Sequence, residues 1–284
     1  MTEENENTEV KESKRKTTLG ELGNRLPIYD GSENTEFTFR EWDMDMEEKL
    51  SDLQEEAANV GAFVRSMMDL LLDEFKGKDY QSLGKEEKIL ALSQLHFPNM
   101  MYMYMALRVE ELGHELHFEN VQCPHCQKQI KDFIADLRGL DVECKDKEHE
   151  AIVDYELRKP ITMPGIGDAP NKMVTGLRIA VSKWDSLEKV PSEKAANAEF
   201  VKKAIFNSAI TGCTNNGELV DGFIDTKALI RKIKKIDIEK IGKVVVENNA
   251  GPDMKLSGNC LHCKKDFETQ INWGYESFFD SSSL

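Results

Sequence analysis

The sequence has no excess of basic residues and no long apolar run. Lys and Arg number 37 against 52 Asp and Glu, which gives a formal net charge of −15. A chain this acidic repels a phosphate backbone, so we expect no nucleic-acid partner. No apolar run approaches the roughly 20 residues that cross a bilayer, and the first residues are acidic and polar, unlike a signal peptide. We therefore expect no membrane partner and a protein made in a reducing cytoplasm.

Cysteine is scarce, and recognisable catalytic motifs are missing. Six cysteines occur in 284 residues, and four of them form two CxxC pairs. In a reducing compartment this usage favours metal or redox chemistry over a disulfide framework. The chain has no phosphate-binding loop, no dinucleotide fingerprint and no pattern of His with Ser or with paired carboxylates. The sequence therefore gives no positive case for an enzyme or for a small-molecule substrate.

Hydrophobic periodicity predicts the α+β class. Apolar spacings of three or four predict helices over about 38–111, and the run MMYMYMAL at 100–107 is interpreted as a helix buried on most sides. Alternating stretches such as EAIVDYELR at 150–158 and GLRIAVSKW at 176–184 predict strands. Helical spacing returns over 193–212 and, after a cap at Asp225, as far as Val246. The chain is thus predicted to begin with helices and to continue with mixed structure.

The two CxxC pairs lie in segments that repeat each other. VQCPHCQKQI at 121–130 and GNCLHCKKDF at 258–267 share both cysteines, the His before the second cysteine and the Lys two positions after it. Each CxxC turn offers two thiolates to one metal, and zinc prefers four such ligands in a tetrahedron. The long intervening segment costs little, because loop-closure entropy rises only logarithmically. The favoured prediction is one closed, structural Zn²⁺ site formed by Cys123, Cys126, Cys260 and Cys263.

Three alternatives remain open from the residues alone. CPHC also occurs in thioredoxin-fold disulfide oxidoreductases, where a helix follows the first cysteine, and KQIKDFIADL at 128–137 has helical potential. Such a fold needs an earlier strand, which the helices predicted over 38–111 do not supply. A local zinc finger made of Cys123, Cys126, Cys144 and His149 has an acceptable spacing but leaves the second pair unused. The third alternative is two unrelated turns without metal.

The remaining histidines and cysteines of interest have simpler interpretations. His125 and His262 stand beside predicted ligands, and adjacent side chains rarely reach one metal together, so both are expected to face solvent. Cys144 and Cys213 are expected to be small buried apolar residues unless Cys144 serves the local finger.

Taken together, these motifs resemble one known family. An N-terminal region opening FTFREWDMDMEEKLSD, a later helix running into CPHC, strands ending in YELRKP and a closing CLHCKKDFETQINWGYESFF are similar to the zinc-ribbon baseplate and tail-assembly proteins of contractile-tailed bacteriophages. The resemblance supports the four cysteines as paired knuckles and Arg158-Lys159-Pro160 as a strand end. The sequence departs from the family at Gln127 and Lys264, where a glycine commonly follows the second cysteine. A residue with a side chain adopts the positive φ of that position at modest cost.

Composition and periodicity also imply a domain division. Residues 1–18, with one Val and no aromatic residue, are predicted to be a disordered tail. A helical domain is predicted over 19–115, followed by a zinc-ribbon-like α+β domain over 116–280 with a large helical insertion at about 190–248. Residues 281–284 are predicted to fray.

The function that the resemblance implies is structural. The protein is expected to be a non-enzymatic hub or hub-assembly component of the tail baseplate, built in the host cytoplasm, located in the virion and partnered by other baseplate or tail proteins. The aromatic segment with Trp273, Tyr275, Phe278 and Phe279 is expected to meet a neighbouring chain or to pack on the ribbon. Alternatives are a tail-assembly chaperone absent from the mature particle and a thiol-disulfide oxidoreductase.

Overall fold

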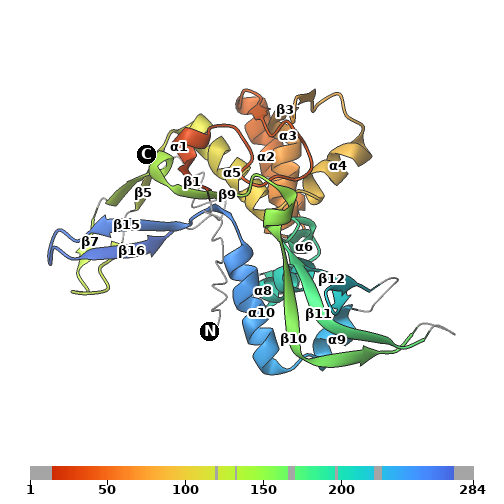
Figure 1. Cartoon of the computed structure of the whole chain (residues 1–284). Coiled ribbons are helices and arrows are strands. Elements are labelled where there is room, and N and C mark those ends of the chain that lie inside the picture. Colours follow the sequence, from red (N-terminus) through yellow and green to blue (C-terminus); the bar gives the residue numbers. More distant parts are fainter. Residues whose placement is uncertain are drawn as a thin grey trace, which may run out of the picture.

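The computed structural model describes residues 15–118, 121–131, 133–165, 170–195, 198–220 and 226–271. The fold is mixed α and β, as predicted. Figure 1 shows a helical body, a second lobe of strands and helices, and an arm of paired strands. The predictions for residues 1–14, for the aromatic segment after Ile271 and for the cap at Asp225 lie outside the described residues.

The helical body contains the four helices predicted from periodicity. Their bounds are α2 Met44–Glu56, α3 Val60–Leu71, α4 Lys85–Ser93 and α5 Phe97–Leu112. Asp43 caps α2 by accepting a hydrogen bond from the backbone N–H of Met46, and Asn59 caps α3 in the same way through Ala62. These side chains satisfy donors that the first helical turn leaves free, which explains where each helix begins.

A small antiparallel sheet also lies in the helical body, so the prediction of helices alone over 38–111 is wrong. Its strands are β2 Phe37–Phe39, β3 Leu72–Phe75 and β4 Lys78–Asp79. Lys76 and Gly77 join β3 to β4, and both have positive φ, 54° and 72°. A two-residue turn with that geometry matches the twist of antiparallel strands.

Helix α5 is the centre of the helical body. Every residue from Met100 to Leu107 is buried, which confirms the interpretation of MMYMYMAL as a core helix. At its last turns the buried Arg108 donates to the carbonyl oxygens of Gly113 and Glu115, at 2.6 and 3.1 Å. This guanidinium satisfies carbonyls beyond the helix end and fixes the path of the chain into the next strand.

A three-stranded sheet joins segments that are far apart in the sequence. Its order is β1 Arg15–Thr18, β9 Asp141–Cys144 and β14 Gly251–Pro252. The prediction that residues 15–18 belong to a disordered tail is therefore wrong, because their backbone pairs with β9. Thr18 then caps the short helix α1 Leu19–Leu22 in a capping box with Glu21, which ends the strand.

The second lobe is built on a four-stranded antiparallel sheet. Its strands, in order, are β10 Ile152–Met163, β11 Lys172–Ala180, β12 Ile210–Asn215 and β13 Glu218–Leu219, preceded by the 3-10 turn η2 Glu148–Ala151. The expectation of a strand end at 158–160 is wrong, because β10 continues to Met163. The helices of this lobe are α7 Ser192–Ala195, α8 Ala198–Ala209, α9 Thr226–Lys232 and α10 Lys235–Asn248. Buried residues of the sheet and of α9 and α10 form a separate core that includes Leu177, Ile179, Leu229 and Ile241.

The predicted helical insertion is helical only in part. The helix expected over 193–212 ends at Ala209, and Ile210 begins β12, which pairs with β11. Asn216 and Gly217, with φ of 52° and 85°, then turn the chain into β13. Asn-Gly is a strong signal for a two-residue hairpin, and it explains why strands replace the end of the expected helix.

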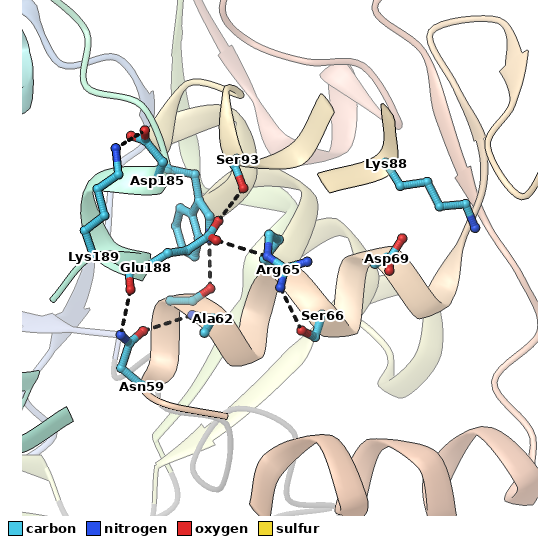
Figure 2. Close-up of polar contacts among 12 residues, drawn as sticks. Asn59, Ala62, Arg65, Ser66, Asp69, Lys88, Ser93, Asp185, Glu188 and Lys189 are labelled. Atoms are coloured by element: carbon cyan, nitrogen blue, oxygen red, sulfur yellow. Dashed lines mark hydrogen bonds and ion pairs between the residues drawn. The ribbon is translucent and has the colours of Figure 1, made fainter. Parts of the chain in front are cut away.

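Helix α6 Asp185–Glu188 joins the second lobe to the helical body through a polar network (Figure 2). The carboxylate of Glu188 accepts from Arg65 of α3 at 3.1 Å and from the hydroxyl of Ser93 of α4 at 2.9 Å. The Asn59 amide donates to two carbonyl oxygens, those of Glu188 and Val190. Helix α3 with its cap, and helix α4, are thus bonded to α6 and to the residues that follow it.

The arm carries the remaining strands. β5 Glu115–Phe118 pairs with β8 Phe133–Asp136, β6 Val121–Gln122 with β7 Gln129–Ile130, and β15 Lys255–Asn259 with β16 Asp266–Gln270; the 3-10 turn η1 Leu137–Gly139 follows β8. The expected helix running into CPHC is wrong, because α5 ends at Leu112 and two strands precede the motif.

The Glu188 network leads to a stability prediction. We expect Glu188→Ala to lower the free energy of unfolding by about 1–3 kcal/mol, because it leaves the half-buried Arg65 and Ser93 without their acceptor. The matched control is Lys189→Ala, which removes an ion pair to Asp185 whose lysine side chain is 74% exposed. We expect that control to change stability by no more than about 0.5 kcal/mol. Equal losses for both variants in urea unfolding would show that the network contributes nothing specific.

Candidate metal centre

The two CxxC segments form matching hairpin turns at the end of the arm. In the first turn the Cys123 backbone N–H donates to Lys128 O, and the Gln127 N–H donates to Cys123 O, at 3.0 and 2.9 Å. In the second turn Cys260 and Lys264 repeat both bonds, at 2.9 and 2.8 Å. The sequence repeat is therefore also a repeat of backbone conformation.

The residue before each first cysteine adds a further matching contact. The Gln122 side-chain amide donates to Gln127 O at 3.1 Å, and the Asn259 amide donates to Lys264 O at 3.3 Å. Each turn is therefore held by a side-chain hydrogen bond as well as by backbone bonds.

The residue after each second cysteine has a left-handed backbone. Gln127 has a φ of 58° and Lys264 a φ of 60°. These are the two positions where the sequence departs from the glycine of the resembled family. The turn geometry is thus reached without glycine, at the steric cost that a Cβ carries in this region.

The four cysteine side chains of the two turns lie together. The Sγ atoms of Cys123 and Cys263 are 3.7 Å apart, those of Cys126 and Cys260 are 3.8 Å apart, and all four lie within 4.8 Å of one another. A sulfur tetrahedron around a metal with bonds of about 2.3 Å has edges of about 3.8 Å. The donor set and its spacing therefore fit one tetrahedrally coordinated metal ion.

The thiols influence one another's protonation. The hydrogen bond from the backbone N–H of Cys263 lowers the pKa of the Cys260 thiol to about 6. The backbone N–H of Lys265 also lowers the pKa of Cys263, but burial and hydrogen bonds with the neighbouring thiols outweigh it and raise that pKa to about 11. Cys260 therefore becomes a thiolate more readily than Cys263, and thiolates are the species that bind metals.

His125 and His262 connect the two hairpins across the site. The Nε2 atom of His125 lies 2.9 Å from Asp266 O, and that of His262 lies 3.3 Å from Gln129 O. Asp266 and Gln129 occupy equivalent places, six residues after the first cysteine of each turn. Both rings are exposed, as expected, but each also bonds the opposite hairpin, which the sequence reading did not anticipate. The contacts give the site an approximate two-fold symmetry.

An aromatic layer lies beneath the cysteines. Phe133 of β8 contacts Phe118 and Phe267, with ring centroids 5.6 and 5.4 Å apart. A Cβ at Gly258 would lie 2.6 Å from the Phe133 ring and 2.8 Å from the Phe267 ring. The absence of a side chain at Gly258 thus lets the rings pack directly on β15 and join the two hairpins.

The residues of the local-finger alternative lie elsewhere. Cys144 is buried in β9 and belongs to the core of the helical body, and His149 lies in η2. Within the described residues, the group of ligand side chains close enough for one metal consists of the four cysteines of the two turns. Cys213 is buried in β12, among the apolar residues of the second lobe, as expected.

The surroundings of CPHC differ from those of a thioredoxin-type redox centre. Such a centre places a helix directly after the first cysteine, whose N-terminus stabilises the thiolate. Here the chain continues into β7 and β8, so the helical potential of KQIKDFIADL is not realised. The second CxxC pair also lies in contact with the first.

The chain was compared with protein-family models, with curated proteins and with solved structures, and none of these comparisons gives a match. Among the described residues, no helix combines the length and the apolar character that a membrane span requires.

The left-handed turn residues generate a prediction. We expect Gln127→Gly to raise the free energy of unfolding by up to about 1 kcal/mol, because it removes the Cβ strain at positive φ. The control is Lys128→Gly, an exposed neighbour without positive φ. At position 128 glycine only adds conformational entropy to the unfolded chain, so we expect the free energy of unfolding to fall by about 0.5–1 kcal/mol. Urea unfolding of the reduced protein measures both, and a loss at position 127 as large as that at 128 would contradict the strain argument.

Proposed function

We propose that the protein is a non-enzymatic structural or assembly component of a bacteriophage tail baseplate, and that one Zn²⁺ holds its arm together. The observation that carries the structural role is the cysteine cluster: four protein thiols supply the four ligands that zinc takes in a closed site. Such a site leaves no coordination position for water or substrate. Zinc is preferred because it combines thiolate ligands with tetrahedral geometry.

The assignment to a baseplate is supported by the sequence resemblance. That resemblance includes the paired knuckles, the YELRKP segment and the N-terminal FTFREWDMDMEEKLSD. The position of the cysteine cluster is consistent with an assembly role, because the arm projects from the helical body (Figure 1). A projecting arm stiffened by a metal presents a fixed surface to neighbouring chains.

Metal analysis tests the site. We expect one zinc per chain in the wild type and its loss in Cys260→Ser, because three remaining thiolates bind zinc much more weakly. Cys144→Ser is the matched control: it changes another buried cysteine, which lies outside the cluster, and should keep the metal. Replacing zinc by Co²⁺ in the wild type should give the absorption of tetrahedral thiolate coordination, a measurement that requires no variant to fold. Full zinc in Cys260→Ser, or a metal-free wild type, would refute the site.

The place of the protein in the phage needs a separate measurement. We expect quantitative mass spectrometry of purified tail particles to find the chain in a fixed ratio to other baseplate proteins. Presence in assembling lysates but absence from finished particles would instead identify a tail-assembly chaperone. Absence from both, together with disulfide-exchange activity, would favour the thiol oxidoreductase. The result does not depend on which metal the cysteines bind.

A further inference from the structure

A second recognisable surface is a pocket in the second lobe. It has a volume of about 570 Å³ and lies between α6, α8 and α9. Apolar side chains line part of it, namely Val190, Phe200, Ala204 and Ile230. The Oδ1 atom of Asn207 in the same wall is buried and has no hydrogen-bond partner in the described part of the chain.

The rim of this pocket is positively charged, although the chain as a whole carries −15. Lys203 and Arg231 are exposed at the rim, and neither forms an ion pair or hydrogen bond with another described residue. Lys189 is neutralised locally by Asp185, at 2.6 Å. Within the described part of the chain, the pocket therefore offers two cations without a partner around an apolar floor, which suits an acidic segment with an apolar side chain.

Helix α2 has the complementary composition. Met44, Glu48 and Asp52 follow one another at intervals of four, so they form one stripe on the helix surface. Met44 is 82% exposed, the most exposed of the large apolar side chains in the described residues, and both carboxylates are exposed. Like charges four residues apart destabilise a helix, and nearby cations would relieve that repulsion.

The stripe and the pocket belong to different parts of the molecule. Helix α2 packs in the helical body, whereas α9 lies at the far end of the second lobe (Figure 1). Both helices contribute to packed cores, so the two surfaces do not meet within one chain.

We propose that the Met44 stripe of one copy docks in the α6–α8–α9 pocket of a second copy. Met44 lies on the apolar floor, and Glu48 and Asp52 pair with Lys203 and Arg231. Because the two surfaces differ, a pair of copies keeps one free pocket on the first copy and one free stripe on the second, and the contact is head-to-tail. A head-to-tail contact produces a closed ring or an open filament. This proposal is independent of the metal and of the baseplate assignment.

Sedimentation of the full chain at increasing concentration tests the contact. We expect the wild type to self-associate and the double variant Lys203→Glu/Arg231→Glu to do so at least about tenfold more weakly, since lost charge pairs are replaced by repulsion. The control Lys240→Glu/Lys243→Glu makes the same change of net charge on exposed positions of α10 and should associate as the wild type does. Met44→Ser, a surface change without charge, should also weaken association.

Charge reversal on both sides provides the decisive comparison. Glu48→Lys/Asp52→Lys alone should lose self-association, and mixing it with Lys203→Glu/Arg231→Glu should restore a complex, because the intact stripe of the pocket variant matches the intact pocket of the stripe variant and the reversed stripe matches the reversed pocket. Circular dichroism confirms that each variant is folded. A wild type that stays monomeric, a pocket variant that associates normally, or a mixture that forms no complex would each overturn the proposal.

Discussion

The pairing of β9 on both of its edges is the constraint on which the rest of the structure depends. One edge bonds β1, from the start of the described chain, and the other bonds β14, from near its end. The N–H of Asp253 extends this pairing by donating to Asp141 O at 2.8 Å. After β14 the chain therefore begins β15 beside β8, the strand that precedes β9. This position brings the second cysteine turn into contact with the first.

The two halves of the cysteine site are therefore brought together by the folded body and not by contacts within the site itself. Cys126 and Cys260 are 134 positions apart in the sequence, yet the body between them is folded and holds both ends at one place. The entropy lost in closing such a long loop is offset by the packing of the two lobes and not by interactions within the site. The symmetric histidine contacts and the Phe118–Phe133–Phe267 layer then set the relative orientation of the two hairpins.

The features that could be predicted from the sequence have either a periodic pattern of apolar residues or a repeated motif. The apolar periodicity of Met44 to Leu112 predicted four helices, and the all-round apolar character of 100–107 predicted the burial of α5. The likeness of the two CxxC segments predicted that their cysteines meet, which the fold brings about. The positive φ at Gln127 and Lys264 was an expectation from the resemblance to a family with glycine at this position, and the turn has this backbone conformation although neither residue is glycine.

Features that depend on a distant partner were missed. Arg15–Thr18 is polar and carries no strand signal of its own; it becomes a strand because β9 offers unpaired backbone groups. Ile210–Asn215 begins with an apolar residue that continues the spacing of the preceding helix, and it becomes a strand because it pairs with β11. The cross-hairpin role of His125 and His262 depends on a carbonyl in the other half of the site, so no spacing within one segment reveals it.

The order of strands in the β1–β9–β14 sheet also determines when the protein can fold during synthesis. A ribosome releases β1 first, but β1 has no partner until β9 has emerged, and β9 stays open on its other edge until β14 follows. The second cysteine turn comes later still. The helices of the body can form early from local contacts, whereas the strand that ties the body to the arm waits for almost the whole described chain. Assembly of the arm therefore follows the early helix formation and is completed only after β14, β15 and β16 have left the ribosome.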